Sequence, residues 1–169
     1  NRFGHVSPTQ AEDVLSDLGD SIDFILDGGP TTVGVESTVI FVTEEETILL
    51  RPGGIPIEDI EKVVGRVNVK MKISKLLSPG LTKKHYSPKT PLYIYEGNFD
   101  KLIEIDVNGY ALLTPDSNFA IESTIFSLSQ DGDVKEIAAN LFHQLRTLER
   151  MDYRAIIALP VKQNGLGHA

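Results

Sequence analysis

The sequence has 169 residues, of which 41% are hydrophobic and 24% charged, and these proportions exclude a disordered or fibrous chain. It contains no cysteine, which excludes disulfides, zinc ribbons and thiol nucleophiles and is typical of a cytoplasmic protein. The formal net charge of -8 argues against a protein that binds nucleic acid over its whole surface. The longest apolar runs are only as long as strands, so no membrane-spanning helix is expected.

Charge is distributed unevenly along the chain. Between residues 11 and 61 a single basic residue, Arg51, accompanies thirteen acidic residues. Residues 62–91 contain no acidic residue, and their basic residues are Lys62, Arg66, Lys70, Lys72, Lys75, Lys83, Lys84 and Lys89. This run fits either a solvated linker or an anion site. Arg51 favours an anion site, because a lone guanidinium among acids needs a partner or a ligand.

The start of the chain predicts a helix followed by a short strand. Thr9 and Glu12 have the spacing of a capping box ahead of an apolar stripe, and Gly19 is placed to end the helix as its C′ residue. Residues 22–26 predict a strand, because they are largely apolar and stop at the Asp-Gly-Gly-Pro turn signal of residues 27–30.

A β-hairpin is predicted next, from two β-branched runs at residues 38–42 and 47–50 that flank an acidic tip. Arg51 follows directly and is therefore expected at a strand end. A short helix over residues 57–64 and a half-buried strand over residues 67–73 complete this part of the chain.

The second half of the chain has a different pattern. Residues 74–90 have no sustained period and contain Pro79, Gly80 and Pro88, so they predict a linker. Strands are then expected at residues 92–95, 110–114, 124–128 and 155–159, with a long amphipathic helix over residues 134–148. Strands that alternate with helices predict a parallel, Rossmann-like sheet.

Common catalytic and metal-binding signatures are absent from the sequence, among them the phosphate loop, Gly-x-Gly-x-x-Gly and His-Glu-x-x-His. The four histidines lie far apart without ligand spacing, so no protein-held metal cage is expected. Asp131 and Asp133 predict a turn with a helix cap rather than a cation loop. Gly165-Leu166-Gly167 predicts a structural turn.

Three polar clusters are candidates for ligand binding. Residues 7–9 (Ser-Pro-Thr) place hydroxyls and N–H groups at a helix start, which suits phosphate and ordinary capping equally. Residues 34–38 (Gly-Val-Glu-Ser-Thr) place two hydroxyls and a carboxylate before a strand, which fits a turn or a close ligand approach. Residues 78–88 form a basic segment with Tyr86, which fits a solvated tether or a lid over a polyanion.

Several motifs occur in an order typical of one family. They are Asn1-Arg2-Phe3-Gly4 with Ser7-Pro8-Thr9, Leu26-Asp27-Gly28-Gly29-Pro30, Gly34-Val35-Glu36-Ser37-Thr38-Val39, Leu50-Arg51-Pro52-Gly53, and Ser78-Pro79-Gly80 running to His85-Tyr86-Ser87-Pro88. The set resembles the threonylcarbamoyl-AMP synthases in their long, two-domain form. Further matches to the C-terminal domain of that form are Asn140-Leu141-Phe142, Leu145-Arg146 and Gly165-Leu166-Gly167.

The resemblance implies an α/β fold in three parts. Residues 1–73 would be the C-terminal part of a twisted-sheet catalytic α/β domain, residues 74–90 a basic linker or lid, and residues 91–169 a small Rossmann-like parallel α/β domain without its last helix. The Lys-x-Arg motif of the family, and the Ser that precedes Asn1 in its Ser-x-Asn pattern, are absent from the sequence. This piece alone is therefore expected to be inactive.

The resemblance also implies a reaction, in which L-threonine, bicarbonate and ATP give threonylcarbamoyl-AMP and pyrophosphate for the threonylcarbamoyladenosine modification of tRNA. Catalysis would depend on positioning and charge neutralisation, with no residue assigned as nucleophile or base. ATP would carry Mg²⁺. A downstream tRNA-modifying complex would be the partner, without direct tRNA or membrane binding.

Site residues follow from the same motifs. Those expected to bind ATP are Asn1, Ser7, Arg51 and Tyr86, the one expected to bind threonine is Ser37, and the further anion contacts are Lys83, Lys84 and His85. Two non-catalytic alternatives stay open at this point, a nucleotide- or effector-binding module and a module that docks a partner.

Overall fold

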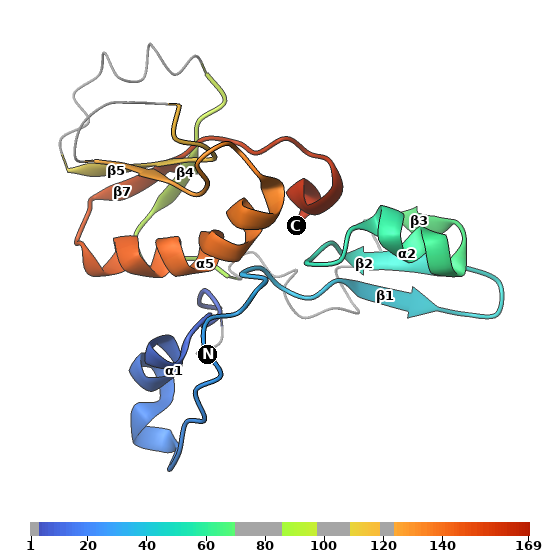
Figure 1. The fold of residues 1–169 in the computed structure, drawn as a ribbon, viewed down its shortest axis with the longest axis horizontal. Helices are drawn as coiled ribbons and strands as arrows, with labels where there is room; N and C mark the ends of the chain where they lie inside the picture. Colours follow the sequence, from blue (N-terminus) through green and yellow to red (C-terminus); the bar gives the residue numbers. More distant parts are fainter. Residues whose placement is uncertain (1–3, 70–85, 98–108, 119–123) are drawn as a thin grey trace.

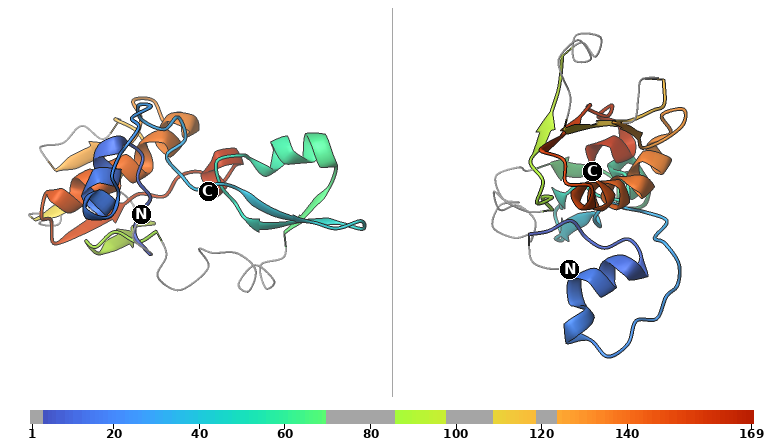
Figure 2. Two further views of the ribbon diagram at one scale, coloured as in Figure 1. Left: turned by 90° about the horizontal axis from the view of Figure 1, so that it is seen from below. Right: turned by 90° about the vertical axis from the view of Figure 1, so that its left-hand side faces the viewer.

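The computed structural model describes residues 4–69, 86–97, 109–118 and 124–169, and these form a mixed α/β structure with two separate sheets. One sheet has three strands in the order β1-β2-β3, and the other has four strands in the order β4-β7-β5-β6. The sheets lie at opposite ends of the molecule (Figures 1 and 2), with helix α5 on the side of the four-stranded sheet and the amino-terminal helix α1 set apart from both. Of the predicted linker, residues 74–85 lie outside the described part of the chain, and residues 86–90 lie within it.

Helix α1 spans Ala11–Leu18 and continues into a 3₁₀ turn, Gly19–Ser21. Its capping differs from the prediction, because the Thr9 backbone N–H and hydroxyl both donate to Asp13, at 3.1 and 3.3 Å, and not to Glu12. Gly19 was expected as a C′ residue and this was wrong, since its φ of −48° is right-handed and carries the chain into the 3₁₀ turn. Asp13 is fully buried, so its carboxylate needs these donors.

The strand predicted at residues 22–26 is wrong. This segment is irregular, and Phe24 and Leu26 are almost fully exposed. An apolar run becomes a strand only where a neighbouring strand supplies the ladder hydrogen bonds. No described strand pairs with these residues.

The three-stranded sheet contains the predicted hairpin. Strands β1 (Val39–Val42) and β2 (Thr47–Arg51) pair antiparallel, and helix α2 (Ile57–Val64) then leads to β3 (Val67–Val69), which pairs parallel with β2. Strand β2 is buried along its apolar length, and Arg51 is its last residue. The prediction of a strand over residues 67–73 is confirmed for residues 67–69, while residues 70–73 lie outside the described part of the chain.

The four-stranded sheet is parallel throughout, as predicted. Its strands are β4 (Leu92–Ile94), β5 (Tyr110–Thr114), β6 (Ile125–Ser127) and β7 (Ala155–Ala158), and all three strand pairs run parallel. Helix α5 (Val134–Arg150) is capped by Asp133, whose side chain accepts from the N–H groups of Lys135 and Glu136, so the predicted cap is confirmed. The Gly-Leu-Gly turn at the end of the chain is a short 3₁₀ helix, Gly165–His168.

The main core lies between this sheet and α5. It contains apolar residues of β5, β7 and α5, together with one residue from the distant amino-terminal segment, Val6. Val6 is only 2% exposed, so the chain beside Ser7 is anchored in the core of the parallel sheet. Among the described residues, no helix combines the length and the apolar composition that crossing a bilayer requires.

Candidate functional site

Four of the predicted site residues meet in one cluster, although they come from segments far apart in the sequence. Ser7 precedes α1, Ser37 precedes β1, Arg51 ends β2, and Tyr86 precedes β4. Glu36 joins the four, and we call these five residues the arginine cluster. The remaining predicted residues, Asn1, Lys83, Lys84 and His85, lie outside the described part of the chain.

Arg51 is the centre of the arginine cluster. Its Nε and Nη2 atoms donate to the Ser37 carbonyl oxygen at 3.0 and 2.8 Å, and Nη2 also donates to the Ser37 hydroxyl at 3.0 Å. Nη1 donates to the Tyr86 hydroxyl at 2.8 Å. A planar guanidinium with several fixed donors suits this arrangement, because it can hold one backbone group while it presents N–H groups to another partner.

Glu36 links Ser7 to Arg51. The Ser7 hydroxyl donates a hydrogen bond to the Glu36 carboxylate, and the second carboxylate oxygen lies 3.7 Å from Arg51 Nη2. Sequence reasoning noticed this carboxylate but assigned it no role. The available signal was the position of Glu36 beside two hydroxyl residues in a short polar segment. Its partners Ser7 and Arg51 lie 29 residues before it and 15 residues after it, so only the fold reveals these contacts.

Tyr86 closes the arginine cluster on the side of α5. Its ring stacks on Phe142 with ring centres 6.2 Å apart, and the Arg51 guanidinium carbon lies 5.8 Å from the Tyr86 ring centre. The Tyr86 backbone has a φ of 52°, in the left-handed region that a bulky residue rarely adopts. Such strain is typical of functional positions, where the surrounding contacts hold the residue in place.

Gly53 allows the turn after β2 to lie directly against residues 36–38. A Cβ atom at Gly53 would stand 2.4 Å from the Glu36 carbonyl oxygen, the Ser37 carbonyl carbon and the Thr38 nitrogen. The neighbouring Gly54 N–H donates to the Glu36 carbonyl at 2.8 Å. This close approach sets the position of Ser37 relative to Arg51, and a side chain at Gly53 would prevent it.

The arrangement offers one fixed cation, hydroxyl groups and a carboxylate, which is suited to holding a charged ligand rather than to forming a covalent intermediate. Within the described ranges, no group of three or more His, Cys, Asp or Glu side chains is placed to hold a metal ion. The fold and the cluster therefore define an α/β protein with a candidate site for an anionic ligand.

Comparison with known proteins identifies the family. Residues 55–169 match the family model described as "Threonylcarbamoyl-AMP synthase, C-terminal domain", and residues 1–53 match the one described as "Telomere recombination". The threonylcarbamoyl-AMP synthase of Pyrococcus abyssi is 36% identical over 182 residues, covering 100% of this chain and 53% of that protein. The corresponding protein of Bacillus subtilis is also 36% identical, covering 100% of this chain and 52% of its own length.

A solved structure is similar along the whole chain. The crystal structure of the P. abyssi protein complexed with L-threonine has a TM-score of 0.82 and 36% sequence identity, covering 100% of this chain and 53% of that one. The chain belongs to the threonylcarbamoyl-AMP synthase family. It spans about half the length of the curated relatives it matches.

Proposed function

We propose that the full-length protein makes threonylcarbamoyl-AMP from L-threonine, bicarbonate and ATP, with release of pyrophosphate, for the modification of tRNA. The observation that carries the proposal is the arginine cluster, in which Ser7, Ser37, Arg51 and Tyr86 meet in a chain of this family. In this proposal Ser7, Arg51 and Tyr86, together with Asn1, bind the nucleotide, and Ser37 binds threonine. Lys83, Lys84 and His85 would add anion contacts.

The proposed chemistry needs no covalent intermediate with the protein. The amine of L-threonine and bicarbonate combine into a carbamate with loss of water. A carbamate oxygen then bonds to the α-phosphorus of ATP, the bond from that phosphorus to the bridging oxygen breaks, and pyrophosphate leaves. Arg51 would neutralise the charge that grows on the leaving group, and the Ser7 hydroxyl would donate to a phosphate oxygen.

Magnesium would enter this site with the nucleotide. Mg²⁺ usually keeps several waters and is held by substrate phosphates with one or two carboxylates, so it needs no cage made of protein side chains. The part of the chain that the structure describes offers no such cage, and Glu36 is a carboxylate placed beside the proposed phosphate donors. A cytoplasmic location and a downstream tRNA-modifying complex belong to the same proposal.

Pyrophosphate release by the full-length protein tests the proposed function. We expect release that requires L-threonine and bicarbonate together, and none from residues 1–169 alone, since these span only half of the relatives' length. Release that is independent of threonine would contradict the proposal. Nucleotide binding without any release would favour the effector-binding alternative instead.

Replacing Ser37 by alanine is expected to raise the KM for threonine about ten-fold in the full-length protein, as for the loss of a hydrogen bond to a charged group. The KM for ATP should change much less, because Arg51 keeps the Ser37 carbonyl as its partner at 2.8 Å. Steady-state kinetics with Ser21→Ala as the control would measure both constants. An equal rise in both would make Ser37 a structural residue.

Replacing Tyr86 by alanine is expected to lower kcat about ten-fold, because the ring over Arg51, whose proposed role is to keep water from the nucleotide, would be lost. Tyr86→Phe should keep most of the turnover, since the ring can still stack on Phe142 while only the hydroxyl is removed. Turnover of Tyr86→Ala equal to that of the unsubstituted protein would contradict the covering role.

A further inference from the structure

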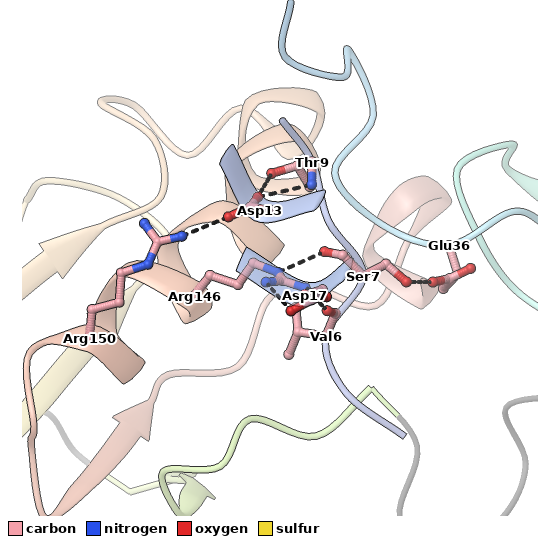
Figure 3. A network of polar contacts seen from close by, with 8 residues as sticks. All are labelled: Val6, Ser7, Thr9, Asp13, Asp17, Glu36, Arg146 and Arg150. Atoms are coloured by element: carbon pink, nitrogen blue, oxygen red, sulfur yellow. Dashed lines mark hydrogen bonds and ion pairs between the residues drawn. The ribbon is translucent and has the colours of Figure 1, made fainter. Parts of the chain in front are cut away.

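Helix α5 carries a row of residues four positions apart, and residues at this spacing lie on one side of a helix. The row consists of Ala138, Phe142, Arg146 and Arg150. The first three each contact a different segment of the arginine cluster, and the fourth contacts α1 instead. Figure 3 shows the two arginines of this row as they reach toward α1 and the segment before it.

The first two residues of the row hold the Ser37 and Tyr86 segments. The Ala138 carbonyl accepts a hydrogen bond from the Gly34 N–H at 3.0 Å, three residues before Ser37. A Cβ atom at Gly34 would lie 2.0 Å from the Ala139 carbonyl oxygen, so this loop lies directly against the helix backbone. The Phe142 ring stacks on Tyr86.

Arg146 holds the third segment, which carries Ser7. Its Nη2 donates to the Val6 carbonyl at 2.7 Å, and its Nε donates to the Ser7 carbonyl at 3.3 Å. The other side of the guanidinium pairs with Asp17 of α1, with Nη2 and Nη1 at 2.6 and 3.3 Å from the carboxylate oxygens. The Arg146 side chain is only 8% exposed, so these partners replace water.

Ser7 is therefore fixed from two directions. Its backbone is bound to Arg146, and the preceding side chain, Val6, is buried in the core that α5 shares with the parallel sheet. Its hydroxyl points the other way, toward Glu36 (Figure 3). A shift of the Val6–Ser7 backbone would move the hydroxyl away from Glu36 and Arg51.

We propose that Arg146 is a positioning residue of the nucleotide site and that the Ala138–Phe142–Arg146 face of α5 is the platform on which the site assembles. This inference rests on the proposed function, in which Ser7 contacts the nucleotide. Arg146 acts through Ser7 and touches no reacting atom. In this proposal the parallel sheet supports α5, and α5 fixes the relative positions of the three segments that carry Ser7, Ser37 and Tyr86.

The chemistry of the contacts explains why an arginine is needed. One planar guanidinium reaches two successive carbonyl groups on one side and a carboxylate on the other. Three guanidinium nitrogens share these contacts, whereas lysine concentrates its three N–H donors on one nitrogen and cannot reproduce the spread. Arg146→Lys therefore preserves the ion pair with Asp17 and loosens the carbonyl contacts.

Arg150 provides a control on the same face of α5, with a more exposed side chain than Arg146 (49% against 8%). It lies one turn further along the same row, and it pairs with Asp13 of α1 at 2.8 Å. Arg150→Lys disturbs the same contact between α5 and α1 without removing a donor to the Ser7 backbone. It is expected to lower the melting temperature and to change the KM for ATP about two-fold or less.

The test is a double-mutant cycle in the full-length protein with the KM for ATP as the readout. Arg146→Lys is expected to raise this KM about ten-fold, because displacing the Ser7 hydroxyl weakens one hydrogen bond to a charged phosphate oxygen. In a Ser7→Ala background the same substitution should produce no further rise, since Arg146 acts through Ser7. Asp17→Asn removes the charge partner of Arg146 and should also raise the KM for ATP. This variant replaces Arg146→Lys in the test if Arg146→Lys does not fold.

Four outcomes would overturn the inference. Equal effects of Arg146→Lys and Arg150→Lys would show a structural contact only, as would full additivity of Arg146→Lys with Ser7→Ala. An unchanged KM in Asp17→Asn would do the same if that variant alone is folded. An unchanged KM for ATP in Ser7→Ala itself would remove the nucleotide role of Ser7, and the inference would fall together with that part of the proposed function.

Discussion

Arg51→Lys is expected to weaken ATP binding by the full-length protein by roughly one to two orders of magnitude, the range for hydrogen bonds to charged groups. In the structure Arg51 uses Nε and Nη2 to hold the Ser37 carbonyl, and Nη1 meets Tyr86. A phosphate oxygen can replace the Tyr86 hydroxyl as the acceptor at Nη1 while Nε and Nη2 keep their hydrogen bonds to the Ser37 carbonyl. Lysine cannot do both, because it presents one compact ammonium group.

Calorimetry of nucleotide binding would measure this loss. Arg66→Lys is a suitable control, since Arg66 is exposed in the turn between α2 and β3, away from the arginine cluster. The control should bind ATP like the unsubstituted protein. Affinity in Arg51→Lys that matches the control would remove Arg51 from the nucleotide site.

Gly53→Ala is also expected to have a large effect, because it should lower the free energy of unfolding and raise the KM for threonine. The new Cβ atom would stand 2.4 Å from three backbone atoms of residues 36–38, which no side-chain rotation can relieve. Overpacking of this kind costs about 1–3 kcal/mol of unfolding free energy. The displacement falls on Glu36 and Ser37, so the KM for threonine should rise as well.

Urea unfolding and steady-state kinetics of the full-length protein would measure the two effects. Gly28→Ala is the matched control, because no atom lies within 4 Å of a Cβ atom built at Gly28. The control should keep its unfolding midpoint and its KM for threonine. If Gly53→Ala behaved in the same way, the close approach of the turn to residues 36–38 would be contradicted.

The sequence predicted those elements whose signal is local. Period-two and helical patterns located the hairpin, α2, α5 and the four parallel strands. Asp133 was predicted as a helix cap because it lies between Gly132 and the start of the helix pattern. The strand predicted at residues 22–26 failed because strand formation depends on a partner that composition does not show. Gly19 failed because a glycine after a helix can also continue it as a 3₁₀ turn.

The site was predictable only in part, and for a related reason. Ser7, Ser37, Arg51 and Tyr86 came from the order of motifs that resembles a family, and the structure brings them together. Arg146 was noticed only as part of a matching motif, because its contact to Ser7 spans 139 positions of sequence. A helix pattern shows that residue 146 shares a face with residues 138 and 142, but not what that face touches.

A crystal structure of the full-length protein with L-threonine and a non-hydrolysable ATP analogue tests the central claim most directly. We expect phosphate oxygens within hydrogen-bond distance of Arg51 and Ser7, threonine at Ser37, and the Val6–Ser7 backbone still held by Arg146. A nucleotide bound instead at the carboxyl ends of the parallel strands, with Arg51 still on Ser37 and Tyr86, would contradict the assignment and favour an effector-binding module.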